Sequence, residues 1–341
     1  MNSEFYRGKK ILVTGGVGSI GAELVRRLLG LQPGIIRIFD NNETGLYDLQ
    51  HDLRSNRVRI LIGDLRDRDR LVMALEGIDL VFHAGALKHV PLCEYNPFDA
   101  IKTNVIGTQN VLDAALVCGV EKVINVSTDK AVSPTNVMGA TKLLAERLTI
   151  SANYYRGEKN TAFSSVRFGN VLNSRGSVIP LFQKQIEAGG PVTVTHEDMT
   201  RFFMSIPSAA ELILKAGEIA KGREIFILKM PALRIIDLAS VMIGEYAPRF
   251  GQDPGSIGIE MIGKREGEKF YEELMTEEEA DRAYEGEDMF IILPQIWPFE
   301  DPLTPHVPKG FRRTAVREFS SRTVPLVGPD EIRRLLRENV G

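Results

Sequence analysis

One short segment of the chain concentrates residue types that can move protons. In VINVSTDKAVSPTNVMGATK, Ser127 and Thr128 end an expected strand, and a carboxyl and an amine follow at once in Asp129 and Lys130. These groups can hold a substrate oxygen, donate a proton and accept one, provided that the site raises the pKa of the carboxyl and lowers that of the amine. From the residues alone, Asp129 and Lys130 could equally form an ion pair in a loop after a strand.

The helix expected after this loop carries a second lysine. Lys142 follows Met138 by one helical turn, so both side chains line one face of the helix. A thioether cannot take a proton, so proton transfer near Met138 would fall to Asp129, Lys130 or a water relayed by Thr128. Met138 itself can fill space under a substrate as an adaptable apolar side chain.

Strands and helices alternate through the first half of the chain, and this alternation would position the reactive segment. Apolar runs typical of strands occupy residues 11–16, 35–40, 58–65, 80–86, 122–129 and 164–172. Strands that alternate with helices are typical of βαβ units, in which helices cover both faces of a parallel sheet. The sequence therefore predicts an α/β fold with a Rossmann-type doubly wound parallel sheet.

The pattern becomes less regular after Phe163, which predicts a second, smaller lobe that binds substrate. Residues 1–171, with about 202–230, are the expected Rossmann domain. Residues 172–201 and 231–341 are the expected C-terminal lobe.

The string TGGVGSIG directly follows the first expected strand and opens a helix. Its glycines follow a GxxGxxG pattern, which lets a backbone approach a pyrophosphate at the helix N-terminus. An acidic residue ends the second strand at Asp40 and another follows the third at Asp64, where they would reach the adenosine part of a dinucleotide. A carboxylate at Asp40 would repel a 2′-phosphate, so NAD is expected in preference to NADP. The residues expected to bind the cofactor are Gly15, Gly18, Ser19, Ile20, Gly21, Asp40, Asp64, Leu65, Ala84, Ala86, Lys88, Asn104, Ser127 and Lys142.

Several further strings resemble the UDP-N-acetylglucosamine 4,6-dehydratase family of polysaccharide biosynthesis proteins, within the extended short-chain dehydrogenase/reductase superfamily. These strings are HAGALKHVPLCEYNP, IKTNVIGTQNV, STDKAVSPTNVMGATK, VRFGNVLNSRGSVIP, MTRFF and KREGEKFYEEL. The resemblance covers about residues 10–275. Most members of the superfamily have tyrosine where this chain has Met138, and the sequence is similar to a Ser-Met-Lys branch of the family in its soluble form.

The resemblance implies a reaction in which C4 of the sugar is oxidised, water is lost across C5 and C6, and hydride returns to C6. The product would be a UDP-4-keto-6-deoxy-N-acetylhexosamine. Thr128 would hold the C4 oxygen, Asp129 would protonate the leaving hydroxyl, Lys130 would be the C5 base, and Lys142 would bind the nicotinamide ribose. The methionine branch would retain the configuration at C5, whereas tyrosine-bearing relatives can invert it. The residues expected to bind the UDP-sugar are Lys88, Asn170, Ser177, Arg201, Arg265 and Glu268.

Two other functions remain open. A nucleotide-sugar epimerase of the same superfamily is one, although epimerases usually keep the tyrosine and lack the consecutive Thr-Asp-Lys. A catalytically inactive NAD-binding protein is the other, and Met138 is its only support. The presence of Asp129, Lys130 and Lys142 together argues against it.

Composition and charge narrow the remaining classes. A net charge of -3 gives no general basic surface for nucleic acid. The two cysteines, Cys93 and Cys118, and the five histidines have no metal-ligand spacing, so no metal site is expected. The lead MNSEFYRGKK has no apolar region typical of a signal peptide, and no run approaches the roughly 18 apolar residues that span a bilayer. We expect a soluble, cytoplasmic protein. By resemblance, it would be a homo-oligomer that pairs through helices near 105–118 and 140–152.

Overall fold

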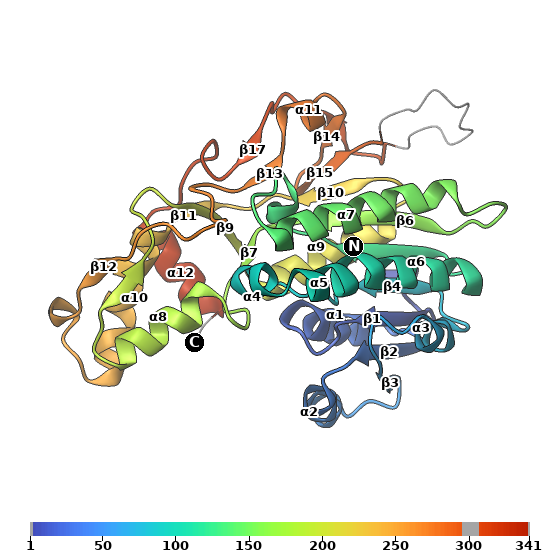
Figure 1. The fold of residues 1–341 in the computed structure, drawn as a ribbon, viewed down its shortest axis with the longest axis horizontal. Coiled ribbons are helices and arrows are strands. Elements are labelled where there is room, and N and C mark those ends of the chain that lie inside the picture. The colour runs from blue at the N-terminus through green and yellow to red at the C-terminus, as the bar shows by residue number, and fades with distance from the viewer. Residues whose placement is uncertain (1–2, 295–306, 340–341) are drawn as a thin grey trace.

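A ten-stranded sheet with helices on both faces is the central feature of the computed structural model, and a smaller lobe lies at one end of it (Figure 1). The structure describes residues 3–294 and 307–339. Residues 1–2, 295–306 and 340–341, which the expected two-lobe division includes, lie outside the described residues. Within the described ranges, no helix is long and apolar enough to cross a membrane.

The strand order of the large sheet is β16-β14-β15-β10-β6-β5-β4-β1-β2-β3. From β3 to β10 every pair of neighbouring strands is parallel. This part of the order reverses at β1, as in doubly wound folds, and confirms the predicted Rossmann-type sheet. The parallel strands are β1 (Lys10–Thr14), β2 (Ile35–Asp40), β3 (Val58–Ile62), β4 (Leu80–His83), β5 (Lys122–Val126), β6 (Ala162–Arg167) and β10 (Ile225–Leu228).

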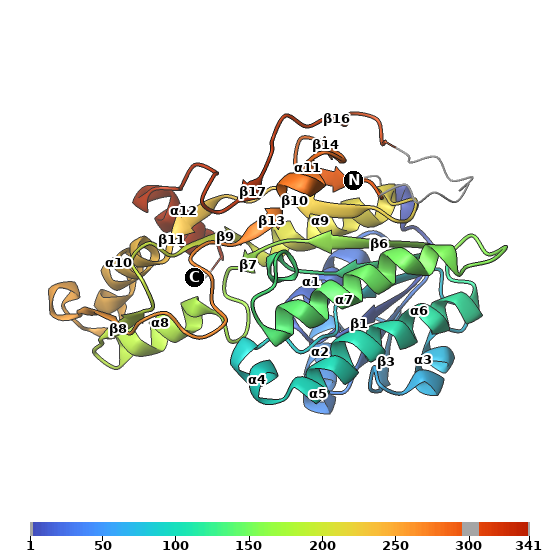
Figure 2. The ribbon, with the colours of Figure 1, turned by 45° about the horizontal axis from the view of Figure 1, so that its top comes forward.

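Alternate side chains of these strands enter two different cores. Ile11 and Val13 of β1 belong to the core under α1 (Ser19–Gly30) and α9 (Ile206–Ile219), whereas Leu12 belongs to the core on the other face. Figure 2 shows the helices of that other face lying side by side along the sheet. The remaining helices around the sheet are α2 (Glu43–Leu53), α3 (Arg68–Leu75), α4 (Val90–Tyr95), α5 (Pro97–Ala100), α6 (Gly107–Cys118), α7 (Val137–Ser151) and α11 (Glu277–Ala280).

The C-terminal part of the chain returns to the large sheet. The sequence assigned residues 231–341 to the second lobe, but β14 (Ala283–Glu285), β15 (Met289–Ile292) and β16 (Arg312–Arg313) extend the sheet beyond β10. β15 pairs antiparallel with β10, so the backbone groups along that edge of the parallel sheet are satisfied.

The predicted sixth strand, residues 164–172, is divided between two sheets. β6 ends at Arg167, and the chain then crosses to the smaller lobe, where β7 (Asn170–Val171) pairs with β9 (Thr200–Met204). The crossing leaves Phe168 and Gly169 between the lobes, beside a cleft.

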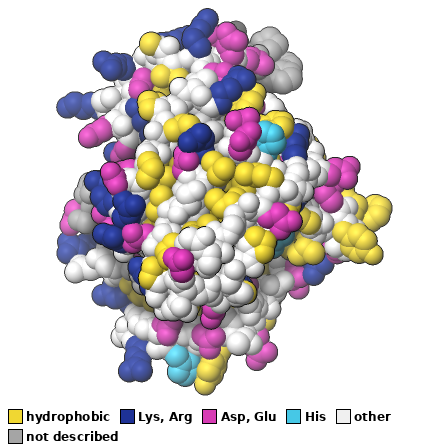
Figure 3. Space-filling view, turned by 90° about the vertical axis from the view of Figure 1, so that its left-hand side faces the viewer, with side chains coloured by type: hydrophobic (Ala, Val, Ile, Leu, Met, Phe, Trp, Pro, Cys, Tyr) yellow, Lys and Arg dark blue, Asp and Glu magenta, His cyan; other side chains and the backbone are white. Residues whose placement is uncertain are grey.

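The smaller lobe has its own apolar core, in which Phe182, Leu238 and Leu336 are buried. Its outer surface carries acidic and basic side chains interspersed among hydrophobic ones (Figure 3). The elements of this lobe, and the short strands that join it to the large sheet, are α8 (Val178–Glu187), α10 (Ile235–Tyr246), α12 (Pro329–Asn339), β8 (Val192–Val194), β11 (Ala232–Arg234), β12 (Ile259–Met261), β13 (Glu273–Met275) and β17 (Phe319–Ser320).

Candidate active site

A cleft of about 920 Å³ opens at the carboxyl ends of the parallel strands. One wall consists of the loops that follow β1, β2, β3, β4 and β5, and the other consists of residues 168–178. Ligands of open α/β sheets bind at this edge, where the strand order reverses. The cleft is large enough for a drug-sized or dinucleotide-sized molecule.

The glycine-rich loop between β1 and α1 forms the floor of the cleft. Gly15 has a φ of +63°, and a Cβ atom there would lie 2.5 Å from the Cα of Gly85. No other residue fits this position, so the two loops can approach one another closely. The first turn of α1, which begins at Ser19, leaves backbone N–H groups without intrahelical partners. This cradle fits a pyrophosphate.

Both predicted acidic residues line the cleft. Asp40 accepts hydrogen bonds from the backbone N–H groups of Val17 (3.2 Å) and Asn42 (3.1 Å), which fix its carboxylate at the end of β2. Asp64 pairs with Arg66, whose hydrogen bonds hold the pKa of that carboxyl below its usual value. Arg66 is a cleft-lining cation that the sequence reasoning did not single out.

Asn104, by contrast, does not line the cleft. It is 1% exposed and lies in a π-helical segment, Ile101–Ile106. Its side chain accepts a hydrogen bond from the Leu87 N–H at 2.8 Å and donates to the Leu87 carbonyl at 2.9 Å and to Thr141 Oγ1 at 3.0 Å. Asn104 thereby anchors the loop after β4. The other expected cofactor residues lie along the cleft: Gly15, Gly18, Ser19, Ile20, Gly21, Leu65, Ala84, Ala86, Lys88, Ser127 and Lys142.

Helix α7 brings Met138 and Lys142 to the cleft, as their spacing predicted. The Nζ of Lys142 donates to the Val126 carbonyl at 2.7 Å, and burial lowers the pKa of this lysine to about 8 against the opposing charge of Glu146. Ser127 Oγ is buried without a hydrogen-bond partner among the described residues, so it is available to a ligand.

A hydrogen-bonded group follows the carboxyl end of β5 and consists of Thr128, Asp129 and Lys130. Thr128 Oγ1 donates to Asp129 Oδ1 at 2.9 Å, and Lys130 Nζ donates to the same oxygen at 3.0 Å. Thr128 and Lys130 line the cleft, whereas Asp129 is fully buried behind them, with Oδ2 next to Gly169.

The prediction that the site lowers the pKa of the Lys130 amine is wrong for the protein without substrate. Burial acts to lower the pKa of this amine, but the charges of Asp129 and Glu272 outweigh it, so the pKa is raised. Lys130 is therefore an ammonium group at rest and must lose a proton before it can act as a base.

Glu272 is the residue of this group that the sequence reasoning missed. Its Oε1 lies 3.3 Å from Lys130 Nζ and 3.8 Å from Arg201 Nε, and its side chain is 4% exposed. The string KREGEKFYEEL contains it, but nothing in the local pattern distinguishes Glu272 from Glu273.

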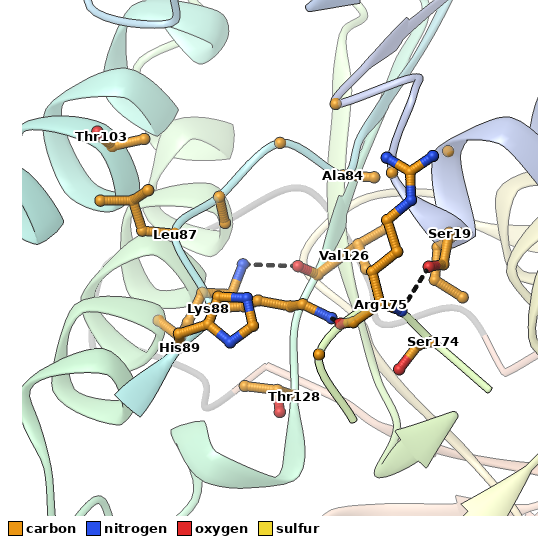
Figure 4. A pocket seen from close by; sticks show the side chains of 18 of the residues that line it. Ser19, Ala84, Leu87, Lys88, His89, Thr103, Val126, Thr128, Ser174 and Arg175 are labelled. Atoms are coloured by element: carbon orange, nitrogen blue, oxygen red, sulfur yellow. Dashed lines mark hydrogen bonds between the residues drawn. The ribbon is translucent and has the colours of Figure 1, made fainter. Parts of the chain in front are cut away.

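The wall formed by residues 168–178 contributes polar groups from the expected substrate set. Lys88 Nζ donates to the Arg175 carbonyl at 2.6 Å, and the Arg175 N–H donates to Ser19 Oγ at 3.2 Å (Figure 4). These bonds tie the wall to the loop after β4 and to the first turn of α1. Burial and the charge of Arg175 lower the pKa of Lys88. Ser177 Oγ is buried with no hydrogen-bond partner among the described residues, and Asn170 Oδ1 lies 3.5 Å from Lys130 Nζ.

The structure does not bring Arg201, Arg265 and Glu268 to the lining of the cleft. The guanidinium of Arg201 donates to the carbonyls of Thr200, Lys269 and Phe270, so its donors already hold the backbone. Arg265 is exposed on the surface, and its backbone N–H donates to a carboxylate oxygen of Glu268 at 3.3 Å. Arg175, which does line the cleft, is a cation that the sequence reasoning missed.

Known relatives match most of the chain. A protein of Methanocaldococcus jannaschii described as an uncharacterized membrane protein is 63% identical over 292 residues, which are 86% of this chain and 88% of the relative. The capsular polysaccharide biosynthesis protein CapD of Staphylococcus aureus is 47% identical over 80% of this chain. The chain spans only about half of that longer relative, 46% of its length.

Relatives with an enzymatic description fall into two kinds. A UDP-N-acetylglucosamine 4,6-dehydratase (inverting) of Campylobacter jejuni is 41% identical over 293 residues, 85% of this chain and 84% of the relative. A UDP-glucose 4-epimerase of Rickettsia rickettsii is also 41% identical, over 83% of this chain and 82% of the relative.

Solved structures share the fold. The structure of Pen from Bacillus thuringiensis is 44% identical, with a TM-score of 0.90 over 98% of this chain and 99% of that chain. The dTDP-glucose 4,6-dehydratase DesIV of Streptomyces venezuelae, solved with NAD and TYD bound, has a TM-score of 0.67 at 23% identity over 76% of this chain and 86% of that chain. The family model described as polysaccharide biosynthesis protein matches residues 11–294. The chain therefore belongs to the polysaccharide biosynthesis protein family.

Proposed function

We propose that this protein is a nucleotide-sugar 4,6-dehydratase that converts UDP-N-acetylglucosamine to a UDP-4-keto-6-deoxy-N-acetylhexosamine. The observation that carries the proposal is the group of Thr128, Asp129 and Lys130 at the cleft that the apolar Met138 also lines. An elimination of water needs an acid and a base held close together, and a carboxyl and an amine 3.0 Å apart supply both. The Campylobacter relative supports the same substrate class.

The positions of the three residues support the roles proposed for them. Thr128 is exposed to the cleft and is bonded to Asp129, so its hydroxyl can hold the C4 oxygen and pass a proton to the carboxyl behind it. Asp129 is buried behind Thr128, so it protonates the leaving C6 hydroxyl by way of the Thr128 hydroxyl, and Lys130 removes the proton from C5. Lys130 also returns a proton to C5 from the same side, because Met138 carries no proton. We therefore expect retention of configuration at C5.

The cofactor proposed for the cleft is NAD, which accepts hydride from C4 and donates it to C6. The close approach at Gly15 and the position of Asp40 and Lys142 along the cleft support this proposal, in which the glycine loop holds the pyrophosphate, Asp40 the adenosine ribose and Lys142 the nicotinamide ribose. Asp40 disfavours a 2′-phosphate by charge repulsion.

The test is to incubate the purified protein with UDP-N-acetylglucosamine and NAD and to follow the mass of the sugar nucleotide. A product lighter by one water, with a C4 ketone in its NMR spectrum, supports the dehydratase. Lys130→Ala is the matched inactive control. An unchanged mass with inverted C4 would instead identify a 4-epimerase, the activity for which the Rickettsia relative is named. No reaction with either UDP-N-acetylglucosamine or UDP-glucose would contradict the proposal.

A further inference from the structure

The amine of Lys130 lies between two buried carboxylates. Its Nζ is 3.0 Å from Asp129 Oδ1 and 3.3 Å from Glu272 Oε1, with Asn170 Oδ1 as a third neighbour at 3.5 Å. The second oxygens, Asp129 Oδ2 and Glu272 Oε2, are buried and have no hydrogen-bond partner among the described residues. A buried carboxylate oxygen without a donor is costly, and a proton on the carboxyl group reduces that cost.

Glu272 is held rigidly and away from the substrate space. Its backbone N–H donates to Ser321 Oγ at 3.0 Å, and its carbonyl accepts from the Ser321 N–H at 2.8 Å. Arg201, anchored on backbone carbonyls, lies on the other side of Oε1 at 3.8 Å. Glu272 does not line the cleft, so it can act on a reaction there only through Lys130.

The proposed elimination requires a proton to leave Lys130. At the moment of water loss, Lys130 must be a neutral amine and Asp129 must be a neutral acid. At rest the neighbouring carboxylates raise the pKa of Lys130. Glu272 is the adjacent group prepared to take the proton, because burial and the charge of Asp129 raise its own pKa despite the nearby cations.

We propose that Glu272 is a positioning residue that stores the proton of Lys130 during turnover. This inference rests on the proposed dehydratase function. It assigns a role to a carboxylate that the three-residue mechanism leaves unused, and it accounts for an amine that is charged at rest and neutral when it acts.

The protons balance over one cycle. With a nicotinamide dinucleotide as the hydride acceptor, the C4 hydroxyl proton passes through Thr128 to Asp129, and Lys130 gives its proton to Glu272. Lys130 then takes the C5 proton while Asp129 passes its proton through Thr128 to the C6 hydroxyl, which leaves as water. After hydride reaches C6, Lys130 returns a proton to C5. Glu272 finally returns the stored proton to Lys130, so the C4 hydroxyl proton has left in the water and the resting state is restored.

The first test compares Glu272→Gln with Glu273→Gln. Glutamine keeps the size of the side chain but cannot store the proton, so kcat of Glu272→Gln at neutral pH should fall by about 10²-fold. The rate should recover toward alkaline pH, because Lys130 must then release its proton to solvent. KM should change little, since Glu272 does not line the cleft. Glu273 pairs with Lys269 at 3.9 Å, and its variant should keep the wild-type kcat and pH profile.

A conservative variant separates proton storage from structural support. Glu272→Asp retains a carboxylate and should keep the pH profile of the wild type, with a smaller loss of kcat. A wild-type kcat for Glu272→Gln, or a loss that does not recover at high pH, would overturn the proposal. An alkaline-dependent profile for Glu272→Asp would also contradict it.

A second measurement needs no turnover. The pKa of Lys130 can be followed by NMR of its side-chain nitrogen in the protein without substrate, with Lys130→Arg to identify the signal. Loss of one carboxylate partner in Glu272→Gln should lower that pKa, and an unchanged value would refute the pairing. If the wild type releases no water from UDP-N-acetylglucosamine, the proposed function fails, while this titration still decides whether Glu272 is paired with Lys130.

Discussion

Replacing Met138 with tyrosine tests whether the active site works without an ionisable group on the first turn of α7. Met138 is 4% exposed, packs with Cys93 and Ala100, and borders the cleft. Cys93 and Ala100 are 1% and 0% exposed, so there is no room behind the methionine for a larger side chain. The ring of a tyrosine must therefore extend into the space that the substrate needs.

Tyrosine at this position could change the reaction rate in two opposite directions. Overpacking a filled site costs about 1–3 kcal/mol, which corresponds to about a 5- to 150-fold lower rate if it falls entirely on the transition state. A correctly placed acid–base group would instead accelerate the reaction by about 10²–10⁴-fold. A lower rate in Met138→Tyr would therefore indicate a site that works with methionine. A higher rate would indicate a site that is impaired because it lacks tyrosine.

The assay is the initial rate of 4-keto-6-deoxy product formation at saturating UDP-N-acetylglucosamine. Met138→Tyr should show no gain and a loss wherever the ring crowds the C4 hydroxyl. Met138→Leu conserves volume and should keep the activity, at a stability cost below about 1.5 kcal/mol. A gain of about 10²-fold or more from tyrosine would show that Met138 is a defect and would refute the reasoning.

Three further predictions concern the cofactor, the base and the buried ion pairs. Titration of the cofactor-free protein should show tighter binding of NAD than of NADP, and Asp40→Asn should narrow the difference; tighter NADP binding in the wild type would be contrary to the charge argument. Lys130→Ala should abolish deuterium exchange from solvent into C5, followed by NMR, while some C4 oxidation persists; exchange at the wild-type rate would assign the base elsewhere. Glu279→Gln should destabilise the protein by about 3–5 kcal/mol in urea unfolding, because Arg167 is buried between carboxylates. Burial acts to raise the pKa of Glu279, but the charge and hydrogen bonds of Arg167 outweigh it, so the pKa is lowered. The stabilisation from this pair is therefore present above the ordinary glutamate pKa of about 4.5 and is lost as the pH falls through the lower folded value. The loss in the variant should therefore shrink in acid, and an equal loss at every pH would contradict this pairing.

The parallel sheet was accessible from the sequence because each of its strands is a local apolar run. Residues 35–40 were predicted as a strand and form β2 over the same residues. Strands β14 and β15 were not assigned to the sheet because they join it through the pairing of β15 with β10, which lies far away in the chain. The spacing of hydrophobic residues indicates which face of a helix or strand is buried, but it does not indicate which distant strand will pair with an edge of the sheet.

The residues of the site likewise divide into those evident from local sequence and those brought together from distant segments. Thr128, Asp129 and Lys130 are consecutive, so their proximity was already evident in the sequence. Glu272 reaches Lys130 only because the chain crosses to the smaller lobe and returns, and no local pattern encodes that contact. Arg201 was assigned to substrate by residue type, but its guanidinium donors hold backbone carbonyls.

Helix α7 connects the chemistry of the cleft to the interior of the protein. Met138, Lys142 and Glu146 recur at intervals of four residues, so they share one face of the helix. The first two border the cleft, and Glu146 accepts hydrogen bonds of 2.8 and 2.5 Å from Arg167 of β6, which also pairs with Glu279. The negative charge of Glu146 opposes the effect of burial on Lys142, whose pKa of about 8 keeps it mainly an ammonium group at neutral pH. The Val126 carbonyl thus holds the amine of Lys142, and the carboxylate of the buried ion pairs keeps it charged, one turn away from the methionine that leaves proton transfer to Asp129 and Lys130.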